Sequence, residues 1–137
     1  MSLIFVYGTL KKGHCREEAM SSERYIGVAR TVDEYAMYSL SSFPGLVKVD
    51  RSKSAGKKIY GELYEVSDEC LEKLDIIEGV QHGLYVREYV DLDEVHMVAL
   101  PLGQQPFQDL QRKRAQAYLY NREVKESKEC GVFWSLR

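Results

Sequence analysis

The sequence predicts an α+β fold: a small, mostly antiparallel β-barrel with one or two flanking helices. Its apolar residues fall into about seven short continuous or alternating segments, typical of strands. These segments are not separated by regular helices, which excludes a doubly wound parallel sheet and favours a closed or half-closed barrel. Ten tyrosines, against one tryptophan and four phenylalanines, favour a sheet-rich fold with a partly polar interior or cleft.

The first half of the chain supplies most of the expected strands. Leu3–Val6 is a continuous apolar run, which predicts a central strand covered on both faces. The remaining expectations are strands at Tyr25–Ala29, Ala36–Leu40, Leu46–Val49 and Ile59–Val66, a short helix at Arg16–Met20, a turn at 41–45 and an exposed hairpin loop at Arg51–Lys58.

One amphipathic helix is expected after the strand that ends at Val66. Ser67 provides a capping hydroxyl, acidic residues follow it, and apolar residues recur at helical spacing as far as Ile77. Gly79 is a natural residue to end the helix. Beyond it, strands are expected at Tyr85–Leu92, Val95–Leu100 and Ala115–Tyr120, and the tail around 132–134 is expected to dock on the core.

Length and composition limit the classes of function. With 137 residues, the chain fits a single domain over 1–137. A net charge of -2 argues against a nucleic-acid partner. Cys15, Cys70 and Cys130 form no CxxC pair, so neither a zinc site nor a redox dithiol is indicated, and a reducing cytoplasmic location is expected. No apolar stretch approaches the length of a membrane span, so no membrane association is expected.

Glu78 is the most informative acidic residue. It lies in LEKLDIIEGV, one residue before the glycine expected to end the helix, where the helix dipole disfavours a negative charge. Asp75 lies three residues earlier and can place a like charge on the same face. Both effects would raise the pKa of the Glu78 carboxyl, which suits a general acid–base residue. A solvated surface glutamate explains the same position without any chemistry, and Asp75 is expected to have a structural role.

A second candidate site is the turn Tyr7-Gly8-Thr9-Leu10. A strand that ends in glycine exposes several backbone N–H groups, which can bind a carboxylate or phosphate. The alternative is a tight turn in which Thr9 caps its own backbone.

Four stretches in this order, FVYGTLKKG, FPGLV, GELYEVSDECLEKLDIIEG and the YVR at Tyr85–Arg87, resemble the gamma-glutamylcyclotransferase-like family, which includes AIG2-like proteins and gamma-glutamylamine cyclotransferases. The resemblance extends from Leu3 to about Tyr120. It implies a compact barrel with a cavity, a catalytic Glu78, and substrate binding by Tyr7, Gly8, Thr9, Leu10 and Tyr85. No metal and no cofactor are implied.

The reaction implied is cyclisation of a gamma-glutamylamine or related amide to 5-oxoproline, with release of the amine. The substrate's own α-amine is the nucleophile, so only a proton carrier and groups that hold the substrate are needed. Two alternatives remain open: a non-catalytic module that binds a small carboxylate through Gly8 and Thr9, and a protein-interaction domain that uses the tail around 132–134. The leaving amine and the oligomeric state are left open by the sequence.

Overall fold

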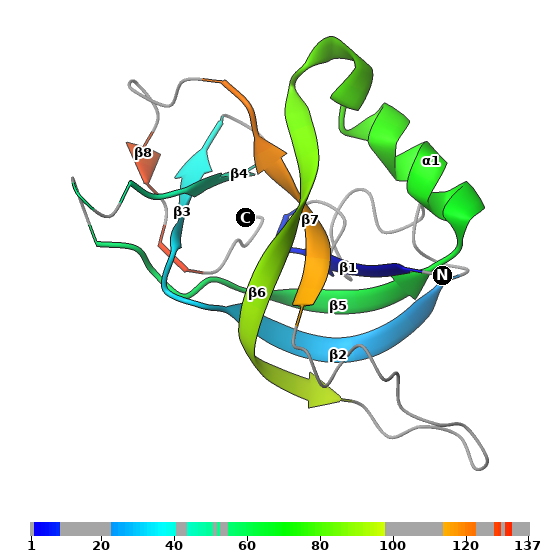
Figure 1. The fold of residues 1–137 in the computed structure, drawn as a ribbon, viewed down its shortest axis with the longest axis horizontal. Coiled ribbons are helices and arrows are strands. Elements are labelled where there is room, and N and C mark those ends of the chain that lie inside the picture. The colour runs from blue at the N-terminus through cyan, green and yellow to red at the C-terminus, as the bar shows by residue number, and fades with distance from the viewer. Residues whose placement is uncertain are drawn as a thin grey trace.

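The computed structural model describes residues 2–8, 23–40, 44–50, 52, 55–97, 114–122, 128–129 and 131–132. The strands in these ranges join one sheet in the order β1-β5-β2-β6-β7-β4-β3-β8 (Figure 1). Their bounds are β1 (Ser2–Val6), β2 (Arg24–Thr31), β3 (Tyr35–Ser39), β4 (Pro44–Lys48), β5 (Tyr60–Val66), β6 (Tyr85–Met97), β7 (Arg114–Tyr120) and β8 (Lys128–Glu129). The helices in the same ranges are α1 (Asp68–Ile77) and the short 3-10 helix η2 (Val80–His82).

The first five strands of this order close into a barrel. Neighbouring strands from β1 through β5, β2 and β6 to β7 are antiparallel. A parallel pairing of β7 with β1, at Ile4 and Gln116, closes the ring. The predicted fold class, a mostly antiparallel barrel with a flanking helix, is confirmed.

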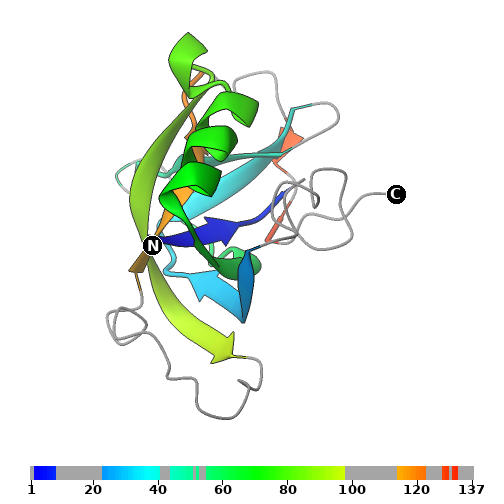
Figure 2. The same ribbon diagram turned by 90° about the vertical axis from the view of Figure 1, so that its right-hand side faces the viewer.

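Both faces of β1 are buried, as the continuous apolar run predicts. Leu3 and Phe5 belong to the core cluster to which all five barrel strands contribute, so they point into the barrel. Ile4 and Val6 point the opposite way and pack with the buried side of α1. Figure 1 shows α1 outside the barrel, and the view turned by 90° shows it covering one side (Figure 2).

The edge of β7 changes partners along its length. Gln116 pairs with Ile4 of β1, whereas Leu119, three residues later, pairs with Leu46 of β4. Both pairings are parallel, so the C-terminal end of β1 and the start of β4 meet beside β7. Tyr7, which directly follows β1, therefore lies where β4 replaces β1 as the parallel neighbour of β7.

Two expected elements are wrong. The segments Tyr85–Leu92 and Val95–Leu100 were expected to be separate strands, but β6 is continuous through Met97. It pairs with β7 up to Asp91 and with β2 from Leu92 onward, so the change of partner occurs within one strand. Asp93 and Glu94, the two acidic residues between the expected segments, do not break the strand, and Asp93 forms an ion pair with Arg30 of β2.

The expected turn at 41–45 is wrong for residues 44 and 45, the part of it that the structure describes. Pro44 and Gly45 are the first residues of β4. Proline is tolerated at the first position of a strand. Gly45 is required by packing: a Cβ there would lie 2.9 Å from Cβ of Tyr120.

Other expectations concern the periphery. The helix expected at Arg16–Met20 and the tail residues Phe133 and Trp134 lie outside the described residues. Val132 is exposed, and its carbonyl accepts a hydrogen bond from the N–H of Tyr60 at 2.8 Å. The short strand β8, which pairs with β3, was not predicted.

Candidate active site

Helix α1 places Glu78 at its C-terminal end. The Ser67 hydroxyl accepts a hydrogen bond from the N–H of Cys70 at 3.1 Å and caps the start of the helix. Leu74 is fully buried against the barrel. Glu78 is the C-cap residue of α1, and Gly79 follows in the left-handed conformation with a φ of 67°. The predicted Ser67 cap and the Gly79 stop are confirmed.

The Glu78 side chain is buried rather than on the solvated surface. Its residue is 9% exposed, although glutamate is normally among the most exposed residue types. The last turn of α1 carries no basic residue, so the negative end of the helix dipole is not offset from within the helix. A carboxylate in such a setting costs free energy that a surface glutamate would not.

Tyr7 follows directly after β1 and is fixed by backbone groups of two other strands. Its hydroxyl donates a hydrogen bond to the backbone carbonyl of Tyr118 in β7. The same hydroxyl accepts a hydrogen bond from the N–H of Leu46 in β4 at 3.1 Å. Tyr7 therefore connects β7 and β4 where the edge of β7 changes partners, and its hydroxyl is already engaged twice within the protein.

Gly8 and Tyr85 meet at Pro44. A Cβ added to Gly8 would lie 2.6 Å from Cγ of Pro44, so the backbone approaches the proline ring more closely than any other residue would allow. The hydroxyl of Tyr85, at the start of β6, donates a hydrogen bond to the carbonyl of Pro44 at 2.7 Å. Pro44 thus joins the turn after β1 to the strand that follows η2.

The hydroxyl of Tyr7 is influenced by its burial and by the charges of Tyr85 and Glu78. Burial raises the pKa of Tyr7 well above its usual value, negative charge on Tyr85 or Glu78 raises it further, and the hydrogen bond from Leu46 lowers it in part. Because Coulomb interactions weaken with distance, Tyr85 and Glu78 lie close enough to Tyr7 for their charges to act on its hydroxyl. The Tyr7 hydroxyl therefore stays protonated at neutral pH, as its donated hydrogen bond to Tyr118 requires.

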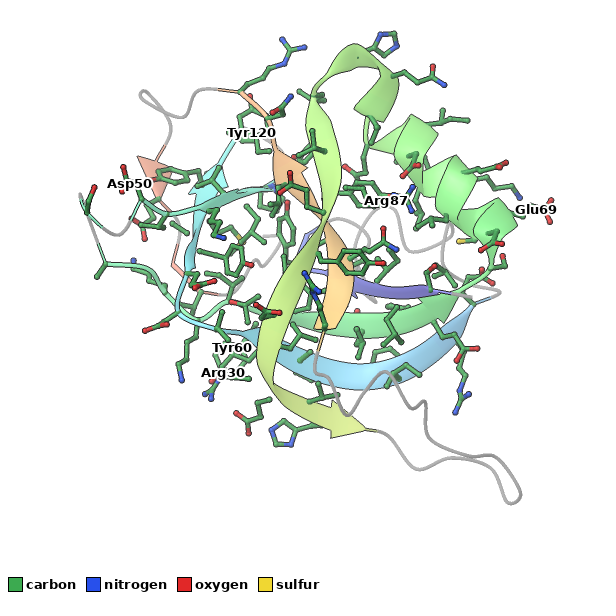
Figure 3. All side chains as sticks on the ribbon, in the orientation of Figure 1. Arg30, Asp50, Tyr60, Glu69, Arg87 and Tyr120 are labelled. Atoms are coloured by element: carbon green, nitrogen blue, oxygen red, sulfur yellow. The ribbon has the colours of Figure 1, made fainter. Side chains whose placement is uncertain are left out.

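A polar cluster lies between α1 and the barrel. Oδ1 of Asp75 accepts a hydrogen bond from the hydroxyl of Tyr118 at 2.6 Å and contacts Nε of Arg87 at 3.1 Å. Figure 3 shows Arg87 reaching from β6 toward α1. Burial and the hydrogen bond to Asp75 raise the pKa of Tyr118, and the charge of Glu78 acts on it in the same direction. Asp75 therefore has contacts that fit the expected structural role, and its partners are the side chains of Tyr118 and Arg87.

The structure places three side chains of the predicted site near one another, namely Tyr7, Tyr85 and Glu78, and seats Gly8 beside them against Pro44. Thr9 and Leu10 lie outside the described residues. Sequence reasoning missed Tyr118. Its strand, Ala115–Tyr120, gave no sign of a polar contact, because the partners come from other elements.

Within the described ranges, no group of three or more His, Cys, Asp or Glu side chains is placed to hold a metal ion. None of the helices described in the structure is both long enough and apolar enough to cross a membrane.

Comparison with known protein families gives one match to residues 4–134, to the family described as gamma-glutamyl cyclotransferase, AIG2-like. A Vibrio cholerae protein provisionally named gamma-glutamylcyclotransferase is 38% identical over 78 residues, covering 57% of this chain and 63% of its own. The zebrafish (Danio rerio) gamma-glutamylaminecyclotransferase A is 36% identical over 96 residues, covering 65% of this chain and 57% of its own. The matched part of the chain thus spans less than two-thirds of the length of either relative.

The fold also matches solved structures. The crystal structure of an AIG2-like protein from Mus musculus superposes with a TM-score of 0.70 at 23% identity, covering 92% of this chain and 81% of that chain. A likeness at this identity shows a shared fold.

Proposed function

Because the chain belongs to the gamma-glutamyl cyclotransferase, AIG2-like family, we propose that it cyclises the γ-glutamyl group of a γ-glutamylamine or related amide to 5-oxoproline and releases the amine. The substrate is thus a small molecule. The name of the zebrafish relative, a gamma-glutamylaminecyclotransferase, supports an amine as the leaving group. No metal or organic cofactor takes part in the proposed reaction.

The reaction needs no nucleophile from the protein. The α-amine of the substrate attacks its own γ-carbonyl carbon, a five-membered ring closes, and the bond between that carbon and the amide nitrogen breaks. Holding the substrate in its folded conformation supplies much of the acceleration, since well-oriented intramolecular reactions reach effective concentrations of about 10⁵ M or more.

Glu78 is the proposed proton carrier. Its carboxylate takes a proton from the α-ammonium group, which frees the nitrogen lone pair for attack, and the resulting carboxylic acid gives that proton to the amide nitrogen as the carbon–nitrogen bond breaks. The ring nitrogen loses a second proton as the lactam forms, and this proton passes to the released amine, which departs as an ammonium ion. The observation that carries this proposal is the burial of Glu78 at the negative end of α1, where its charge acts on Tyr7 and the last helical turn has no basic residue. The proposed role requires this carboxyl to change between its ionised and its neutral form during the reaction.

The other site residues have proposed roles in binding. The turn at Tyr7, Gly8, Thr9 and Leu10 would hold the glutamyl carboxylate or the developing oxyanion through backbone amides. Gly8, which has no side chain, would allow a close approach to the backbone. The Tyr7 hydroxyl already bonds to Tyr118 and Leu46, so Tyr7 contributes by fixing this turn. Tyr85 would form a wall of the site.

The test is a panel of matched substrates. The folded protein is incubated with γ-glutamylamines and γ-glutamyl dipeptides, and 5-oxoproline and free amine are both quantified. We expect the two products in equal amounts from at least one compound, and no reaction with its N-acetyl derivative, whose blocked amine cannot attack. Release of free glutamate would indicate hydrolysis instead. Binding of 5-oxoproline without turnover of any compound would favour the carboxylate-binding module.

A further inference from the structure

Asp75 joins the last part of α1 to the barrel through two strands. Its Oδ1 accepts the Tyr118 hydroxyl of β7 at 2.6 Å and pairs with Nε of Arg87 of β6 at 3.1 Å. Tyr118 and Arg87 are themselves opposite one another in the pairing of β6 with β7. One carboxylate oxygen is therefore held by two adjacent side chains of a rigid part of the sheet.

This anchor lies one helical turn before Glu78. Residues three apart in a helix share a face, so Asp75 and Glu78 are neighbours on the side of α1 that meets the barrel. The link continues past Asp75, because Tyr118 is engaged at both ends: its hydroxyl bonds to Asp75, and its backbone carbonyl accepts the hydroxyl of Tyr7. Tyr118 thus joins the two halves of the candidate site.

We propose that Asp75, Tyr118 and Arg87 are positioning residues that hold Glu78 near Tyr7 and balance the charge around it. The proposal rests on the function proposed above, in which Glu78 carries the proton. Tyr118 and Asp75 fix the end of the helix, and hence the place of Glu78. Arg87 supplies the positive charge that the last turn of α1 lacks.

The charges of the cluster act on a common region. The phenol of Tyr118 interacts with the negative charges of Asp75 and Glu78 and with the positive charge of Arg87. Glu78 acts electrostatically on both Tyr7 and Tyr118; Tyr85 also acts on Tyr7, and Asp75 and Arg87 also act on Tyr118. Removing the Arg87 charge leaves Asp75 as an unbalanced like charge and disfavours ionised Glu78, whereas removing the Asp75 charge has the opposite effect.

The first test follows the ionisation of Glu78 directly. The ¹³C signal of its side-chain carboxyl, assigned by its loss in Glu78→Gln, is titrated in the wild type and in variants. Arg87→Met should move the midpoint up and Asp75→Asn should move it down, each by roughly half a pH unit or more for charges within about 10 Å. Arg87→Lys, which keeps the charge, should stay near the wild type.

The matched control is a second, similarly exposed Arg–Asp pair on the barrel. Nε of Arg30 contacts Oδ1 of Asp93 at 2.8 Å, and Figure 3 shows Arg30 far from Arg87 and from α1. Arg30→Met should leave the Glu78 midpoint unchanged while reducing stability. If Arg87→Met and Asp75→Asn also leave the midpoint unchanged in folded protein, the proposal is overturned. Asp75→Asn keeps an acceptor for Tyr118, so the test survives even if Arg87→Met unfolds.

The second readout is catalysis. Tyr118→Phe removes the hydroxyl that anchors Asp75 and should lower kcat by about tenfold, with little change in KM, because the proton carrier is misplaced rather than the substrate. Arg87→Met should shift the acidic limb of the kcat profile to higher pH. If the wild type is active, an unchanged kcat in Tyr118→Phe together with an unshifted pH profile in Arg87→Met contradicts the positioning role. That outcome leaves the proposed function standing. A wild type that is inactive on every γ-glutamyl compound contradicts the proposed function, and the carboxyl titration still decides the charge relationship.

Discussion

The hydroxyl of Tyr7 donates a hydrogen bond to the backbone carbonyl of Tyr118, a residue 111 positions later in the chain. Both residues are buried, and the same hydroxyl accepts the N–H of Leu46. The end of β1 is therefore fixed to β7 and β4 by a single oxygen atom. This contact holds Tyr7 and the start of the proposed binding turn next to β7, the strand whose Tyr118 hydroxyl bonds to Asp75.

Replacing Tyr7 with Phe should destabilise the protein. The substitution leaves a buried N–H and a buried carbonyl without this partner, which typically costs about 1–3 kcal/mol. Chemical denaturation would measure the loss in the free energy of unfolding. Tyr89→Phe is the control, because Tyr89 is 60% exposed and its ring would keep the contact with Arg114. Equal stabilities for the two variants would contradict the role of the Tyr7 hydroxyl.

Replacing Gly8 with Ala should also destabilise the fold, for a steric reason. The new methyl group would lie 2.6 Å from Cγ of Pro44, and a proline ring cannot rotate away. Overpacking of this kind typically costs about 1–3 kcal/mol. A double-mutant cycle with Pro44→Ala tests the cause, since removing the ring should relieve most of the cost. Additive effects of the two substitutions would show that the strain lies elsewhere.

Acid should remove the contribution of Asp93 to stability. Hydrogen bonds from Arg30 and Lys58 lower the pKa of this carboxyl below its ordinary value of 3.8. A depressed pKa contributes stability that is fully present above the unfolded value and is lost as the pH falls through the folded value. Between about pH 4 and pH 2, Asp93→Asn should therefore lose less stability than the wild type, as measured by denaturation at each pH. Parallel slopes would contradict this.

The Cys70 thiol should be unreactive in the folded protein. Burial, followed by the hydrogen bond and charge of Glu23, raises its pKa to about 12. At pH 8 the thiolate fraction is then on the order of a thousandfold smaller than for a free cysteine. In a Cys15→Ser/Cys130→Ser background, a thiol reagent should label Cys70 only after denaturant is added. Rapid labelling of folded protein would show that the thiol is ionised or accessible.

Local signals in the sequence predict the helix and the position of Glu78. The Ser67 hydroxyl, the spacing of Leu71 and Leu74, and Gly79 each act within a few residues, so the limits of α1 follow from the chain itself. The continuous apolar run of β1 likewise predicts burial on both faces. The burial of Glu78 was left open, because it depends on what the helix packs against.

Long-range contacts account for what the sequence did not predict. The length of β6 depends on β2 taking over as its partner where β7 ends, and the start of β4 at Pro44 depends on the free edge of β7 beyond β1. The contact of Tyr118 with Asp75 joins a strand to a helix 43 positions away. No short window of sequence contains both residues.

The most direct test of the central proposal compares 5-oxoproline release by the wild type and by Glu78→Gln on the best γ-glutamylamine of the panel. Glutamine keeps the size of the side chain but cannot carry the proton, so kcat should fall by about 10²–10⁴ while the unfolding transition and far-ultraviolet circular dichroism remain those of a folded protein. Undiminished turnover by folded Glu78→Gln would contradict the account, because the buried carboxylate at the end of α1 would then have no part in the reaction.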